Sequence, residues 1–113
     1  MQLGLPLAAK IYLSGPMTGI PDFNFPEFDR IAKNLRDAGY DVVSPADLNR
    51  KREDAGQVLS EIFYSDFMKE DIRELSKCDA IYMMKGWRYS PGAKHELENA
   101  LVFALTVFFQ EGS

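Results

Sequence analysis

The chain of 113 residues and 12.8 kDa is 46% hydrophobic and 27% charged, proportions typical of a soluble globular domain. Its net charge of -4 and its pI near 4.9 argue against a nucleic-acid polymer as partner. The single cysteine, Cys78, excludes an internal disulfide, and together with the single histidine, His95, it argues against a structural zinc site. No apolar run has the length of a membrane span and no basic segment opens the chain, so we expect one domain over residues 1–113 in a reducing, cytoplasmic setting.

The first predicted element is a strand over Lys10–Ser14, a short β-rich run that follows an irregular lead-in, Met1–Ala9. The segment Gly15–Pro21 comes next and contains two glycines and two prolines. It is either a surface turn or a loop whose glycines let backbone amides approach a ligand. It lacks the Gly-Lys-Ser/Thr of a P-loop and the GxGxxG of dinucleotide-binding proteins, so neither of those phosphate sites is supported.

A first helix is predicted to begin at Asn24, which can cap it, with Glu27 three residues later in the pattern of a capping box. Its apolar positions recur at helical spacing and are Phe28, Ile31, Ala32 and Leu35. Gly39 is expected to end the helix, and Tyr40–Ser44 to form a second short strand that Pro45 stops. This order of helix, glycine and strand is typical of a βαβ unit.

The next segment, Ala46–Gln57, is polar and is predicted to be a loop, with its mixed-charge run Lys51–Asp54 exposed to solvent. A second helix is expected from a cap at Ser60 as far as Leu75, because its apolar residues again fit a period of 3.6. Its carboxylates are Asp66, Glu70, Asp71 and Glu74. Most of them are expected to face solvent, although one could lie toward the carboxyl edge of the sheet.

A third, buried strand is predicted over the apolar run Asp79–Met84. Ser90 and Pro91 then have the pattern of a helix cap and a first helical residue, and the helix is expected to start near Gly92. Glu96 would lie about one turn inside this helix. A carboxylate there is either ordinary helix-dipole chemistry or, because helical side chains tilt toward the N-terminus, a functional group aimed back at the loop.

A fourth short strand, Thr106–Phe109, precedes a polar tail, Gln110–Ser113, that we expect to be loose. Helices between all strands predict a parallel sheet covered on both faces. The expected fold class is therefore α/β, a Rossmann-like (flavodoxin-like) three-layer sandwich with about four parallel strands in the order 2-1-3-4. That order opens a crevice between the first and third strands, where Gly15–Gly19 and Ser90–Glu96 would flank one cleft.

Three motifs, in order and at matching spacing, resemble the nucleoside 2-deoxyribosyltransferase superfamily. They are Ile11–Met17, Asp71 followed by Cys78–Ile81, and Ser90–Gly92 followed by Glu96 and Leu97. The superfamily also includes the 2′-deoxynucleoside 5′-phosphate N-hydrolases. The nearest resemblance is to a branch of small, largely uncharacterised, often phage-borne domains that begin with a Tyr-Leu-x-Gly-Pro-Met-Thr-Gly pattern. It covers Lys10 to about Ala104.

The resemblance implies roles for matching positions. Glu96 matches the nucleophile that attacks C1′ of the deoxyribose, and Asp71 matches an acidic residue that assists the departing base. The expected substrate-binding residues are Tyr12, in the sugar pocket, Gly15, Pro16 and Met17, in the first loop, and Ser90 and Gly92, at the 5′ end of the sugar. Trp87 is added to these residues because of its aromatic side chain and not because of the resemblance. Together with Arg88 and Tyr89 it forms an aromatic and cationic rim that either stacks on a base or packs within its loop.

The implied function is cleavage or exchange of the N-glycosidic bond of a 2′-deoxynucleoside or its 5′-monophosphate, without a metal or cofactor, in a homodimer or larger homo-oligomer. A carboxylate suits this chemistry because it stabilises or traps an oxocarbenium-like state. Thr18 stands where phosphate-specific members carry an arginine, so a 5′-phosphate requirement stays open, and Phe103–Thr106 replaces the usual glycine after the last helix. The alternatives are a non-catalytic nucleotide-binding module and a hydrolase of another ribosyl bond, such as that of an NAD derivative.

Overall fold

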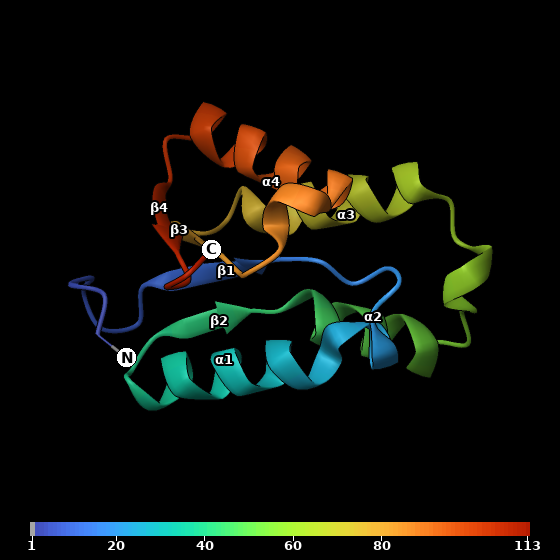
Figure 1. Cartoon of the computed structure of the whole chain (residues 1–113), viewed down its shortest axis with the longest axis horizontal. Coiled ribbons are helices and arrows are strands. Elements are labelled where there is room, and N and C mark those ends of the chain that lie inside the picture. The colour runs from blue at the N-terminus through green and yellow to red at the C-terminus, as the bar shows by residue number, and fades with distance from the viewer. Residues whose placement is uncertain (1) are drawn as a thin grey trace.

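The computed structural model describes residues 2–113 and contains a four-stranded parallel sheet in the order β2-β1-β3-β4 (Figure 1). In chain order the elements are β1 (Lys10–Ser14), α1 (Phe25–Asp37), β2 (Asp41–Val43), α2 (Pro45–Asp54), α3 (Tyr64–Leu75), β3 (Ala80–Met83), α4 (Pro91–Val102) and β4 (Thr106–Phe109). Helix α1 lies on one face of the sheet, with α2 packed against α1 beyond the end of β2, and α3 and α4 lie on the other face. The predicted fold class and strand order are confirmed.

Strand β1 lies in the middle of the sheet and divides its side chains between the two layers. Ile11 and Leu13 pack in the core beneath α1, whereas Tyr12 packs in the core beneath α3 and α4. All three are fully buried, as expected of a central parallel strand. Ser14 pairs with Met83, so β1 and β3 end side by side at the same edge of the sheet. That edge is where open α/β sheets place their ligand sites.

Helix α1 follows its sequence pattern closely, and its predicted stripe of Phe28, Ile31, Ala32 and Leu35 is buried. The helix ends as expected at Gly39, whose φ of +99° is a conformation that favours glycine. The amide of Gly39 donates to Arg36 and that of Tyr40 donates to Leu35, which is the pattern of a Schellman motif.

The predicted capping box at the start of α1 is wrong. Asn24 has a left-handed backbone and its side chain does not cap the helix. Its Nδ2 instead donates to the carbonyl oxygen of Pro16 at 3.0 Å, and Glu27 pairs with Arg30. Asn24 therefore fastens the first loop to the helix start.

The segment predicted as a loop is mostly a helix, α2. Its buried residues include Asn49 and Arg52 beside Pro45 and Ala46, so the face that packs is partly polar. Hydrophobic periodicity cannot reveal such a helix. The predicted solvent exposure of the charge run holds for Lys51, Glu53 and Asp54, but Arg52 is only 7% exposed.

Two further predictions at element ends are wrong. Ser60 lies in a short 3₁₀ turn, and α3 begins later, with Phe63 in the N-cap position. The chain end is not loose at Gln110, whose amide donates to Met83 at 2.7 Å and whose side chain accepts from the amide of Lys85 at 2.8 Å. The lead-in forms no helix or strand over residues 2–9, as predicted, and its first residue lies outside the described part.

Candidate active site

A cavity of about 520 Å³ lies at the carboxyl edge of the sheet, between the loop after β1, the start of α4 and one face of α3. Its lining residues are Gly15, Pro16, Met17, Thr18, Phe23, Pro45, Asn49, Leu59, Ser60, Tyr64, Phe67, Met68, Asp71, Tyr89, Ser90, Pro91, Gly92, Ala93 and Glu96. Most of this surface is apolar or aromatic, and Asp71 and Glu96 are its ionisable carboxyl groups. A largely apolar pocket with a few convergent polar groups is typical of a small-molecule site.

Glu96 lies against the end of β1 and is held there by two hydroxyl groups. Tyr12 donates a hydrogen bond to Oε2 of Glu96, and Ser14 donates one to Oε1 at 2.7 Å. Tyr12 and Ser14 are two positions apart on one strand, so both face the same side of the sheet. Glu96 is 5% exposed, and its position in the second turn of α4 directs it back toward the sheet edge.

The environment of Glu96 disfavours its ionised form. Burial is the main cause and raises the pKa of Glu96 to about 8, and the negative charge of Asp71 acts in the same direction. The hydrogen bonds from Tyr12 and Ser14 lower this pKa, because they stabilise the carboxylate. Burial and the charge of Glu96 hold the pKa of Tyr12 well above its usual value, so the phenol remains a donor. A strongly perturbed carboxyl group in a cavity is typical of a functional site.

Asp71 comes to the same cavity from α3 and is 9% exposed. Burial raises its pKa, while Arg52, whose Nη2 donates to Oδ1 of Asp71 at 3.0 Å, opposes that rise. Of the four carboxylates on this helix, Asp71 is thus the one that lies toward the sheet edge. The sequence left open that one of these carboxylates lies toward the carboxyl edge of the sheet, and in the structure Asp71 does so.

Arg52 is the main feature of the site that the sequence did not predict. This buried guanidinium donates to Glu70 at 2.9 and 2.8 Å, to Asp71, and to Oδ1 of Asn49. Its Cζ lies 4.8 Å from the centre of the Phe67 ring, within cation–π distance. Because a guanidinium only donates, the amide oxygen of Asn49 must face Arg52, and its Nδ2 lies 3.8 Å from Sδ of Met17. Arg52 therefore orders one side of the cavity.

The start of α4 forms another wall. The side chain of Ser90 accepts from the amide of Ala93 at 3.2 Å, so Ser90 caps the helix as its sequence pattern predicts. It also lines the cavity with Gly92. Across the cavity, Gly15 passes so close to Met84 that a side chain at Gly15 would meet Cβ of Met84 at 2.8 Å. The loop path at this point requires glycine.

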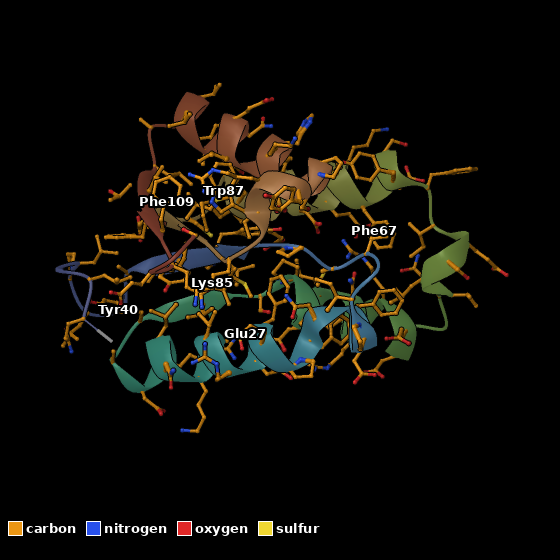
Figure 2. All side chains as sticks on the ribbon, in the orientation of Figure 1. Glu27, Tyr40, Phe67, Lys85, Trp87 and Phe109 are labelled. Atoms are coloured by element: carbon orange, nitrogen blue, oxygen red, sulfur yellow. The ribbon has the colours of Figure 1, made fainter. Side chains whose placement is uncertain are left out.

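Most of the predicted site residues come together. Those lining the cavity are Gly15, Pro16, Met17, Asp71, Ser90, Gly92 and Glu96, and Tyr12 lies behind Glu96. Trp87 is not among the lining residues. It packs 5.7 Å from Phe109 between ring centroids, and Cζ of Arg88 lies 4.8 Å from the centre of its ring; Figure 2 shows Trp87 and Phe109 together near β4. Of the rim proposed from the sequence, Tyr89 reaches the cavity.

The sequence analysis did not predict that aromatic side chains of α3 form a wall of the cavity. Tyr64, Phe67 and Met68 line the cavity together with Asp71, at helical spacings of three, four and seven residues. This spacing was a usable signal, because it places all four on one face of the helix. Asn49 had no such signal, since it lies in a segment without apolar periodicity.

The fold and the cavity define an α/β protein of the Rossmann-like class with a largely apolar cavity at the carboxyl edge of its sheet. A family model described as "Domain of unknown function (DUF4406)" matches residues 9–109, and the chain belongs to this family. A search of curated proteins finds no match.

The solved structures that share the fold include two from deoxyribosyltransferases. One is a 2-deoxyribosyltransferase from Bacillus psychrosaccharolyticus, with 23% identity, a TM-score of 0.67, and alignment over 89% of this chain and 71% of that one. The other is a 2-desoxiribosyltransferase from Leishmania mexicana, with 16% identity, a TM-score of 0.65, and coverage of 89% and 63%. The resemblance to this superfamily is confirmed for the fold.

Over residues 2–113 no group of three or more His, Cys, Asp or Glu side chains is arranged to hold a metal ion. No helix within these residues is long and apolar enough to cross a membrane.

Proposed function

We propose that this protein is an enzyme that cleaves the N-glycosidic bond of a 2′-deoxynucleoside or its 5′-monophosphate, with Glu96 as the nucleophile. The observation that carries the proposal is the buried Glu96 carboxyl group, fixed by hydroxyl donors on both oxygens at the wall of a nucleoside-sized cavity. The deoxyribosyltransferase fold supports the same chemistry.

The mechanism has two displacements at C1′. An oxygen of ionised Glu96 forms a bond to C1′ as the bond from C1′ to the base nitrogen breaks and its electron pair leaves with the base. Asp71 donates a proton to the departing base. Water, or the N–H group of a second base, then attacks C1′ and gives its proton to the carboxylate of Asp71 while the bond from C1′ to Glu96 breaks, so both carboxyl groups return to their starting states and the configuration is retained. Positive charge developing on the sugar favours the ionised form of Glu96, which offsets the cost of its burial.

The cavity walls favour a substrate with an uncharged 5′ end. Among residues 2–113 no lysine or arginine lines the cavity, and Thr18 occupies the loop position where phosphate-specific relatives carry an arginine. Ser90 and the amide of Gly92 are suited to bind a 5′-hydroxyl. Tyr64, Phe67 and Met68 offer the apolar surface on which a base can stack. We therefore favour the nucleoside over the nucleotide as substrate.

The test is turnover of a substrate panel followed by chromatography with mass detection. The panel contains deoxynucleosides, their monophosphates, ribonucleosides and NAD, each with and without free acceptor bases. The wild type is expected to release free base, or to form a new nucleoside when an acceptor is present, and Glu96→Gln to do neither. Glu98→Gln is the matched control, because Glu98 is an exposed carboxylate on the same helix.

A non-catalytic nucleoside-binding module is the second candidate, and one observation favours it. With a pKa of about 8, Glu96 is largely protonated at neutral pH, and a neutral carboxyl group binds ligands without attacking them. Thermal stabilisation by a panel member without turnover of any would support this candidate and overturn the enzyme. Turnover of NAD alone would move the activity to another ribosyl bond.

A further inference from the structure

Arg52 is a buried cation with two acidic neighbours of very different exposure. Its Nε and Nη2 both donate to Oε2 of Glu70, at 2.9 and 2.8 Å, and Nη2 also donates to Oδ1 of Asp71 at 3.0 Å. The side chain of Glu70 is 53% exposed, whereas those of Arg52 and Asp71 are 7% and 12% exposed. Glu70 thus reaches the cation from solvent, and Asp71 reaches it from the cavity.

Asp71 does not have to be ionised to balance the charge of Arg52. Arg52 carries one positive charge, and the ionised carboxylate of Glu70 balances it through two hydrogen bonds. A buried cation needs a partner, but here the partner is already supplied. Arg52 donates to Oδ1 of Asp71, and Oδ2 accepts no hydrogen bond from any side chain or backbone group of residues 2–113. One oxygen is therefore anchored and the other is available to carry a proton.

We propose that Arg52 is a positioning residue that fixes Asp71 at the cavity wall, and that Glu70 is the counter-ion that balances the charge of Arg52. Asp71 can then stay protonated and hold the proton that a departing base takes up. This inference rests on the proposed function, because it assigns a role within the same reaction. Without Glu70, Asp71 itself would balance the charge of Arg52, and a smaller share of Asp71 would hold a proton to donate.

The groups around Asp71 predict the direction in which its pKa changes when the charge of Glu70 is removed. Arg52, from α2, lowers the pKa of Asp71, and Glu70 and Glu74, from α3, raise it, while burial is the largest cause of the net rise. Glu96 from α4 and Tyr12 from β1 also face it, and the negative charge of Asp71 raises the pKa of both. Removing the charge of Glu70 takes away one raising influence and strengthens the lowering one. The pKa of Asp71 should fall.

The experiment compares Glu70→Gln with wild type on two substrates. One is the best deoxynucleoside of the panel, whose base must be protonated, and the other is 4-nitrophenyl 2-deoxyriboside, whose leaving group departs without a proton. Glu70→Gln is expected to lower kcat for the nucleoside about tenfold, a part of the roughly 100-fold or greater effect of a full general acid, and to leave kcat for the nitrophenyl substrate unchanged. Asp66→Asn is the matched control, because it neutralises an exposed carboxylate on the same helix that does not contact Arg52.

A pH profile gives a second readout that a structural defect would not produce. The limb of the nucleoside profile that disappears in Asp71→Asn should move to lower pH in Glu70→Gln. Equal losses of kcat on both substrates, or a limb at the same pH as in the wild type, would overturn the inference. The activity of the wild type would still support the proposed function in that case. If the wild type turned over no substrate at all, the proposed function itself would be wrong. Unchanged melting temperature in Glu70→Gln would confirm that the comparison concerns chemistry and not folding.

Discussion

The hydroxyl of Tyr12 donates a hydrogen bond to Oε2 of Glu96, although 84 positions separate the two residues in the chain. Tyr12 is fully buried in the middle of β1, and Glu96 is buried on α4. Their contact joins the central strand of the sheet to the helix that forms the cavity wall. It also couples the proposed nucleophile to the core, so that changes to either residue should affect both the rate and the stability of the protein.

Tyr12→Phe should slow the reaction. A hydrogen bond to a charged group contributes about 1.5–3 kcal/mol, so its loss predicts a fall in kcat/KM of roughly 10- to 150-fold. Steady-state kinetics with the best panel substrate would measure this. Tyr82→Phe is the control, since Tyr82 is buried on the neighbouring strand but packs beneath α1, in the other core. Equal effects of the two substitutions would contradict a specific role for the Tyr12 hydroxyl.

The pH dependence of the attack should follow the ionisation of Glu96. With 4-nitrophenyl 2-deoxyriboside no proton is needed for the leaving group, and only the ionised carboxylate attacks, so kcat/KM should rise with pH and level off above the pKa of about 8. Ser14→Ala removes a hydrogen bond that lowers this pKa and should move the midpoint to higher pH. A profile that stays flat from about pH 6 to about pH 9, a range of ~3 pH units that includes the expected midpoint, would exclude Glu96 as the nucleophile.

Glu96→Gln should stabilise the protein at alkaline pH. The pKa of Glu96 is about 8 in the folded state against an ordinary 4.5, so between these values the folded state holds a proton that the unfolded chain has lost. Stability must therefore fall as pH rises through this window, by at most about 5 kcal/mol. The amide does not titrate and avoids the loss. Thermal melts should show the variant above wild type at pH 8 and equal to it near pH 4.5; a constant difference would refute the raised pKa.

Gly15→Ala should destabilise the protein, because the added Cβ would lie 2.8 Å from Cβ of Met84, an atom fixed to the backbone. Overpacking of this kind costs about 1–3 kcal/mol, measurable by denaturant unfolding. Gly92→Ala is the comparison. Its added Cβ meets nothing closer than the Tyr64 hydroxyl at 3.7 Å, so stability should hold while KM rises as the methyl group enters the cavity. Similar stability losses in both variants would show that contact distance is not the cause.

Ala104→Gly should stabilise the protein. Ala104 follows the end of α4 with a φ of +58°, a left-handed conformation that costs a residue with a Cβ roughly 1–2 kcal/mol. Glycine adopts this conformation freely, although it loses more entropy on folding, so we expect a net gain of about 1 kcal/mol. The control is Ala38→Gly at the end of α1, where φ is -81° and the same substitution should destabilise. Denaturant unfolding would give both signs, and a loss in both variants would contradict the strain at Ala104.

The sequence by itself determined the elements whose signals are local. The β-rich run of β1, the apolar stripe of α1, the glycine after that helix and the serine cap of α4 each depend on neighbours in the chain, and each is as predicted. The strand order followed from the connections, because helices between parallel strands allow few arrangements. That order was enough to bring the loop after β1 and the start of α4 to one cleft.

Only the tertiary structure decided which polar groups are buried and which partners they have. Arg52 reads as part of a solvated charge run, and it is buried because Glu70, Asp71 and Asn49 satisfy its donors from two helices. Asp71 is one of four similar carboxylates in the sequence, and the sequence left open whether Trp87 stacks on a base or packs within its loop, whereas the structure packs it on Phe109. Burying a polar group costs free energy unless a partner compensates it, and a compensating partner distant in the chain leaves no local pattern. The Tyr12–Glu96 contact and the Arg52 cluster arise in this way, from side chains that only the folded sheet and its helices bring together.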